Sequence, residues 1–140
     1  MPHAEKQVIT VDLADAAAAD KDYYVVPMGA GEWELTGFTF VPSSAGAAVT
    51  DGTEHRTLTA SIGGTNIAVI TTNSGTTGFV ALVAGTPAAC TTFTAGGTAT
   101  SAANTATGGT DACKIASVHG GATGKLANGN AVCEFTKRRA

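Results

Sequence analysis

Short segments of alternating apolar and polar residues constrain the fold of this 140-residue chain more than any other feature. In residues 55–62, for example, Leu58, Ala60 and Ile62 alternate with Thr57, Thr59 and Ser61. A period of two predicts half-buried β-strands, and the glycine-, asparagine- and proline-rich stretches between such segments predict turns. About eight strands are expected and no convincing long helix. The sequence therefore predicts an all-β protein, a jelly-roll-like β-sandwich of about eight strands, with an immunoglobulin-like sandwich as the alternative.

Residues 33–41 form the clearest of the expected strands. Trp33 and Leu35 share one face and Phe38 and Phe40 the other, so we expect a central strand covered on both sides. Gly63-Gly64 predicts a two-residue hairpin turn that brings a following strand back beside residues 55–62. The other expected strands are residues 7–13, 23–27, 66–72, 77–84, 112–118 and 131–137, and 77–84 is expected to be central because it is almost continuously apolar.

The length of the chain corresponds to one domain. Residues 1–6, which have mixed charges and no period, are expected to form an N-terminal arm on a single β-sandwich domain of residues 7–140. Residues 85–111 are rich in Thr, Gly and Ala and have only one large side chain, so they are expected to form a long surface loop with a weak strand at 91–95.

Charge is scarce, at 14% of residues against roughly a quarter in ordinary domains, and a net charge of −3 argues against nucleic-acid binding through a basic face. A surface with so few charges suits a subunit that packs against others, and compositional drift in a genome rich in G and C is the alternative. The basic end, residues 137–139, either contacts an acidic neighbour or is solvated. Acidic residues near the N-terminus interrupt any signal-like run, and no apolar run is long enough to span a membrane, so we expect synthesis in a cytoplasm and no membrane partner.

A search for chemistry favours no enzyme, cofactor or metal. The stretch HGGATGKL (119–126) lacks the first glycine and the Ser/Thr of a phosphate-binding loop. Cys113 with His119 is the nearest nucleophile–base pair, and Asp51, Glu54 and His55 are the nearest metal-ligand group, but both are expected to be structural or solvated. Trp33, Tyr23 and Tyr24 either form a stacking platform for a sugar, or Trp33 plugs the core.

The three cysteines are odd in number and widely spaced, which does not suit a metal site. Free, partly buried thiols are expected in a reducing compartment, with a Cys90–Cys113 disulfide as the alternative.

Taken together, these features resemble the small capsid decoration, or cement, proteins of tailed bacteriophages. The resemblance is carried by the polar arm (1–6), the WELTGFTFVP strand (33–42), the IGGTNIAVITT hairpin (62–72) and the loop 85–111. It implies a virion structural protein on the capsid surface that bridges neighbouring major capsid protein subunits, often as a homotrimer. A receptor- or carbohydrate-binding module of a tail or head fibre is the alternative.

Under the first hypothesis, both ends of the chain are expected to make intersubunit contacts, the N-terminal one by adding a strand to a neighbour's sheet. The candidate interface residues are Pro2, His3, Glu5, Lys6, Gln7, Val8, Lys137, Arg138 and Arg139.

Overall fold

The computed structural model describes residues 5–14, 20–43, 55–93, 105–107, 112–121 and 128–139. These residues form β-strands and connections without a helix, which confirms the all-β prediction. Consequently, the described part of the chain has no apolar helix of membrane-spanning length. The strands are β1 (Lys6–Leu13), β2 (Lys21–Val25), β3 (Glu32–Pro42), β4 (His55–Ile62), β5 (Thr65–Thr71), β6 (Thr92–Phe93), β7 (Thr105–Thr107), β8 (Cys113–Gly120) and β9 (Gly129–Arg139).

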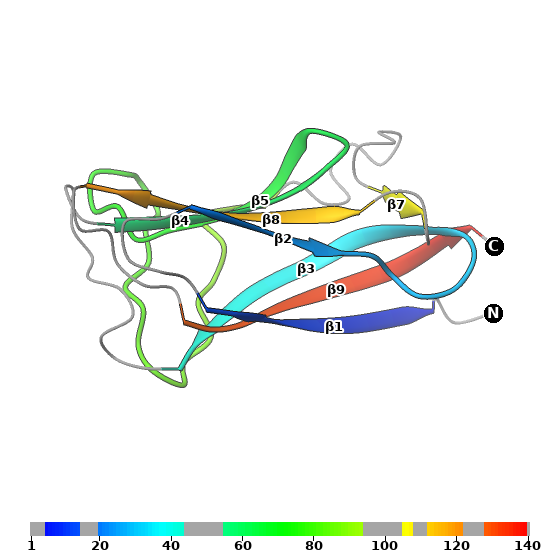
Figure 1. Cartoon of the computed structure of the whole chain (residues 1–140), viewed down its shortest axis with the longest axis horizontal. Helices are drawn as coiled ribbons and strands as arrows, with labels where there is room; N and C mark the ends of the chain where they lie inside the picture. Colours follow the sequence, from blue (N-terminus) through cyan, green and yellow to red (C-terminus); the bar gives the residue numbers. More distant parts are fainter. Residues whose placement is uncertain are drawn as a thin grey trace.

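The strands form two antiparallel sheets that pack face to face (Figure 1). One sheet has the order β1-β9-β3-β7 and the other β2-β8-β4-β5-β6. With the two-residue strand β6 set aside, the pairings are nested: β1 with β9, β2 with β8, β3 with β7 and β4 with β5. A chain that is folded double and then wrapped in this way is a jelly roll, as the sequence predicts.

The innermost pair, β4 with β5, is the hairpin that Gly63-Gly64 predicts. Both glycines have positive φ, 62° and 83°, as a type I′ turn requires. The expected inward residues of β4, Leu58, Ala60 and Ile62, are all buried.

Strand β3 lies inside its sheet, between β9 and β7, but the alternation predicted for its faces is wrong. Trp33, Leu35, Phe38 and Phe40 are all buried in the same core. The register against β9 shifts between Leu35 and Gly37, which marks a β-bulge. Because a bulge adds one residue to one strand, it moves the following side chains to the opposite face and turns both apolar sets inward.

The strand predicted at 77–84 is absent. Residues 72–87 connect without a strand, and the main-chain N–H of Val80 donates to Thr71 O at 2.9 Å. Val80 and Leu82 pack partly against the core, whereas Phe79 and Val83 are exposed. An apolar run without alternation does not distinguish a central strand from an extended connection whose side chains face either way.

The segment 85–111 is less loop-like than predicted where the structure describes it. Ala88 N donates to Phe40 O at 2.8 Å and Thr91 N to Val69 O at 2.7 Å, so the segment touches both sheets. It contains β6, close to the expected weak strand, and β7, whose Ala106 is fully buried. The neighbouring residues 94–104 and 108–111 lie outside the described residues.

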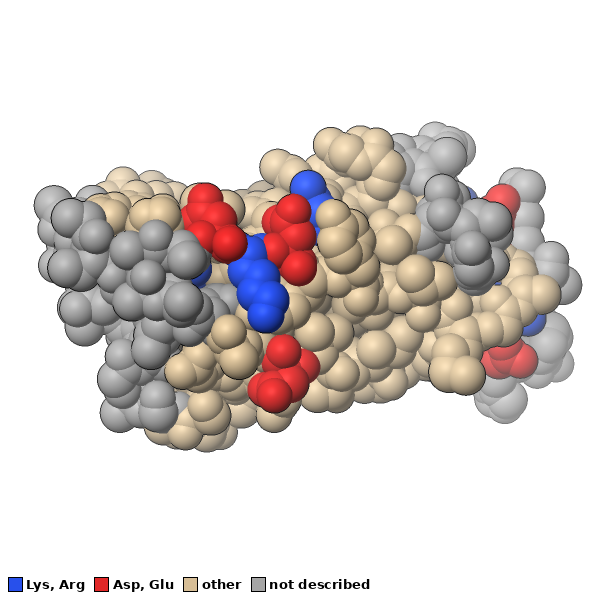
Figure 2. Space-filling model, in the orientation of Figure 1, with Lys and Arg blue, Asp and Glu red and all other residues tan. Residues whose placement is uncertain are grey.

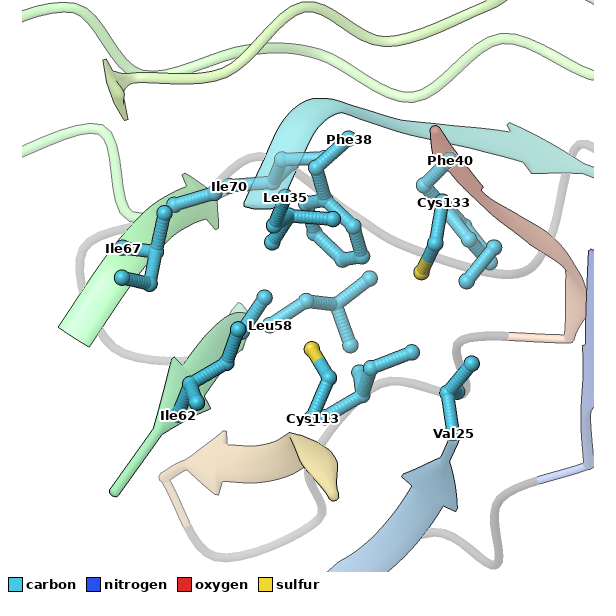
Figure 3. Close-up of a cluster of buried hydrophobic side chains, with 14 of the residues drawn as sticks. Val25, Leu35, Phe38, Phe40, Leu58, Ile62, Ile67, Ile70, Cys113 and Cys133 are labelled. Carbon is cyan, nitrogen blue, oxygen red and sulfur yellow. The ribbon is translucent and has the colours of Figure 1, made fainter. Parts of the chain in front are cut away.

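The core fills the space between the sheets with aliphatic and aromatic side chains and two thiols (Figure 3). Cys113 and Cys133 are buried among them, Cys90 lies at the margin, and all three are free thiols. Trp33 is buried as well, which confirms its predicted place in the core and removes it from any exposed sugar platform.

Candidate functional site

The predicted interface residues from the two ends of the chain lie side by side, because β1 and β9 pair along their whole length. Lys6, Gln7 and Val8 lie opposite Thr136, Phe135 and Glu134. The pairing continues one residue further, where Lys137 N donates to Glu5 O at 2.9 Å. Both chain ends therefore lie at the same end of the sandwich, here called the terminal end (Figure 1). Pro2 and His3 lie outside the described residues.

Charged side chains at the terminal end pair with one another. Lys6 Nζ lies 3.6 Å from Glu134 Oε1, Lys137 Nζ lies 3.5 Å from Glu5 Oε2, and Arg138 Nε lies 3.7 Å from Glu34 Oε2. Lys137 also lies over the Trp33 ring, with Nζ 5.7 Å from its centroid.

The basic end of the chain is part of the sheet. Lys137, Arg138 and Arg139 belong to β9, and the backbone of Arg139 pairs with Glu32. With Lys137 and Arg138 in ion pairs inside the chain, these two residues offer little unbalanced charge to an acidic neighbour.

Strand β1 is an edge strand whose two ends are hydrogen-bonded to β2 and to the connection that follows β2. The Gln7 side chain receives a hydrogen bond from Met28 N at 2.8 Å and donates one to Met28 O at 3.0 Å. At the other end of β1, Ala14 N donates to the Tyr23 hydroxyl at 3.2 Å. These contacts fix β1 in place while its outer edge, on the side away from β9, pairs with no strand of the described chain.

The end of the sandwich opposite the chain termini, here called the distal end, holds a buried polar cluster. Arg56, on the inward face of β4, is almost completely buried, and its Nη1 donates to the buried Ser117 Oγ at 3.3 Å. His119 lies opposite Arg56 on β8, and its Nδ1 is 2.7 Å from Asp20 Oδ1. Sequence reasoning missed Arg56, although its place on the same face as Leu58 was the available signal.

Asp20 is held in its charged form by His119. Its Oδ1 accepts a hydrogen bond from His119 N at 3.0 Å, and this bond, together with the contact to the imidazole, lowers the pKa of the Asp20 carboxyl from 3.8. Next to this pair, the His55 ring lies so close to Gly120 that a Cβ there would overlap it. The histidines thus pack and pair within the distal end.

The structure does not bring the candidate nucleophile and base together. Cys113 begins β8 and His119 lies near its end, a separation of roughly 20 Å along an extended strand. Burial raises the pKa of the Cys113 thiol to about 12 and that of Cys90 to about 11, so both remain protonated near neutral pH. A protonated thiol is a poor nucleophile, which argues against either cysteine in that role.

The described residues contain no group of three or more His, Cys, Asp or Glu side chains arranged to hold a metal ion. Asp51 and Glu54, the predicted companions of His55, lie outside the described residues, as does most of the HGGATGKL stretch.

The large exposed apolar side chains of the described residues fall into two groups, apart from Val118 on β8. The first lies on β1, β2 and the connection after β2, and consists of Val8, Tyr24, Val26 and Met28. The second lies on the connection after β5 and on β6, and consists of Phe79, Val83 and Phe93. Figure 2 shows the β1–β2 side, where Lys, Arg, Asp and Glu gather in a few places and most of the described surface carries no charge.

The order and pairing of the described strands define the class of protein as a jelly-roll β-sandwich. No protein-family model matches it, and neither a curated protein nor a solved structure has significant similarity to it.

Proposed function

We propose that this protein is a virion structural protein that decorates a bacteriophage capsid, where it bridges neighbouring subunits of the major capsid protein. Jelly rolls are a common architecture of viral capsid and lectin domains, so the fold is compatible with this role. The low charge and the resemblance to cement proteins support the capsid over other surfaces. A protein that binds only the assembled lattice stabilises it by mass action, and many modest interfaces add up over a shell.

The observation that carries the proposal is the second apolar group. Phe79 is 41% exposed and Val83 is 56% exposed, and both lie on the connection 72–91, outside any strand. Val80, between them, anchors the connection to β5 through its hydrogen bond to Thr71. A segment that is fixed by a main-chain hydrogen bond and exposes an aromatic and an aliphatic side chain is typical of a protein-binding surface, in which such residues act as anchors.

The predicted contacts of the chain ends form a second part of the proposal. At the terminal end, the ion pairs of Lys6, Lys137 and Arg138 are satisfied internally, so we assign the capsid contact there to residues 1–4, which precede β1. This end and the connection 72–91 lie at opposite ends of the sandwich (Figure 1). A subunit that binds through both ends could span two capsid subunits.

The test is co-sedimentation of the purified chain with assembled capsids of a tailed bacteriophage. The double variant Phe79→Ser/Val83→Ser is expected to bind at least about tenfold more weakly, since anchor truncation typically costs more than 1 kcal/mol per residue. The control is Val118→Ser, which changes a comparably exposed apolar residue on the outer face of β8 and should bind normally. Wild-type binding by the double variant would contradict the assignment.

A deletion of residues 1–4 tests the terminal end in the same assay, because it leaves β1 intact. Reduced binding supports a two-ended bridge, and undiminished binding removes the N-terminal residues from the interface. Failure of the wild-type chain to bind any capsid would overturn the proposed function itself.

A further inference from the structure

The outer edge of β1 has a row of main-chain groups that face away from β9. Since Lys137 N bonds to Glu5 O, the odd-numbered residues of β1 direct their N–H and C=O groups toward β9. Antiparallel pairs alternate, so Lys6, Val8, Thr10 and Asp12 direct theirs outward. The side chains of these four residues also point to solvent, and that of Val8 is 61% exposed.

The order of these four residues is self-complementary. If a second β1 lies antiparallel beside the first with Ile9 opposite Ile9, Lys6 faces Asp12 of the copy and Val8 faces Thr10. This is the register that uses all four residues, and it forms up to about eight main-chain hydrogen bonds. It also places opposite charges across from each other at both ends of the pairing, an arrangement that stabilises cross-strand pairs.

Edge strands that resist self-association are commonly very short, or carry charged side chains, proline or a bulge on the edge. The described β1 is eight residues long, pairs with β9 without a register shift, and contains no proline. Its two outward charges, Lys6 and Asp12, attract in the antiparallel copy, where Asp12 would share Lys6 with the Glu134 that lies 3.6 Å from it in its own chain. The length, regularity and charge pattern of this edge therefore favour pairing with a strand of its own sequence.

Exposed apolar side chains border this edge. Met28, tied to Gln7 by the paired hydrogen bonds, is 79% exposed, and Tyr24 on β2 is 67% exposed. Ile9 and Val11, on the inward face of β1, pack partly against the core and would meet apolar or amide side chains of the copy at the junction. Pairing would thus extend the core of each sandwich and cover part of the uncharged surface seen in Figure 2.

We infer that two copies of this chain associate through antiparallel pairing of their β1 edges, with Ile9 on the two-fold axis. The pairing joins two four-stranded sheets into one continuous sheet. Such an interface is isologous and closes with two copies, so it predicts a dimer instead of the homotrimer that the resemblance implies.

The register can be tested by disulfide trapping in the full chain. In the Ile9→Cys variant the two introduced cysteines would be directly opposite in a pair that is not hydrogen-bonded, with Cα atoms roughly 4.5 Å apart, a spacing that suits a disulfide. In the matched Val11→Cys variant the two positions would be separated by about four residues along the strand, roughly 13 Å, which is too far. We expect a covalent dimer under mild oxidation for Ile9→Cys and not for Val11→Cys or the wild type.

A charge swap provides an independent test by light scattering and sedimentation velocity. Asp12→Lys alone and Lys6→Glu alone each place like charges opposite each other and should raise the dimer dissociation constant about tenfold or more. The double variant Lys6→Glu/Asp12→Lys restores opposite charges across the axis and should recover most of the affinity. Thermal melting by circular dichroism checks that each variant is folded, since Glu134 lies beside position 6 within the same chain.

A wild-type chain that remains monomeric or forms trimers at tens of micromolar, equal trapping of the two cysteine variants, or no recovery in the double variant would each overturn the inference. The proposed capsid binding is judged separately, because a monomer that binds capsids removes only the dimer, whereas a dimer that ignores capsids removes only the decoration role.

Discussion

The terminal and distal ends of the sandwich both contain charged side chains in contact, but those contacts differ in their surroundings. At the terminal end, the ion pairs of Lys6 and Lys137 lie at the surface, where water already solvates each charge. At the distal end, Arg56 and Ser117 are buried between the sheets, and the Asp20 carboxylate contacts the His119 ring. Similar residue types can therefore contribute very differently to stability at the two ends. When one member of a surface ion pair is lost, water solvates the other, whereas the loss of a buried charged residue leaves its polar partners without a hydrogen bond.

The largest expected effect is at Arg56. Arg56→Ala should lower the free energy of unfolding by about 3 kcal/mol or more, because it leaves a cavity and strands buried polar partners such as Ser117. Urea unfolding followed by circular dichroism measures the loss. An effect no larger than that of a surface lysine would show that the distal end relaxes around the missing side chain, and would contradict the expected difference in stability between the two ends.

An intermediate effect, dependent on pH, is expected at Asp20. The pKa of this carboxyl is lowered in the folded protein, mainly by the hydrogen bond from His119 N and then by the contact with the imidazole. Its contribution to stability is therefore present above the unfolded pKa, near 3.8, and is lost as the pH falls through the folded pKa.

Asp20→Asn keeps the shape of the side chain and removes its charge. The variant should be less stable than the wild type at pH 6, and the gap should narrow as the pH falls below about 4 and through the lowered pKa of Asp20. Unfolding curves at several pH values measure the gap. A gap that does not change with pH would mean that the charge of Asp20 contributes nothing.

The smallest effect is expected at the terminal end. Lys6→Ala and Lys137→Ala each break one surface ion pair and should change the free energy of unfolding by about 1 kcal/mol or less. The same urea titration, repeated at high salt, should make the effect of Lys6→Ala smaller still, because exposed charges are screened. Lys137→Ala should keep part of its effect, since its ammonium group also lies over the Trp33 ring. A loss comparable to that of Arg56→Ala would contradict the assignment of these pairs to the surface.

The strands with clean alternation could be predicted from the sequence, because burial of one face leaves a period of two. This holds for β1, where Ile9 and Leu13 point inward as expected, and for the β4–β5 hairpin with its two glycines. The prediction failed where tertiary structure overrides the local pattern. The bulge near Thr36 exchanges the inward and outward faces of β3. Apolar residues 77–84 lie in the connection between β5 and β6 and pair with no strand.

The candidate site could be predicted only in part, for a related reason. The sequence predicts interface candidates at both chain ends, among them Glu5 to Val8 and Lys137. Their proximity, however, depends on the pairing of β1 with β9, and local spacing in the sequence does not encode strand order. Arg56 was missed because a charged residue at the start of an amphipathic strand is usually at the surface. Only the meeting of β4 with β8 places it beneath Ser117 and His119.

The nested pairing also determines when the two sheets can be completed during synthesis and folding. Because the first strand lies against the last over its entire length, β1 has no partner in its sheet until β9 has left the ribosome. The central hairpin, whose strands are separated by two residues, can close early, and each surrounding pair then requires a longer loop to be ordered. We therefore expect slow folding that proceeds from the central hairpin outward. A premature stop that removes the final ten or so residues would leave both β1 and β3 without their shared neighbour.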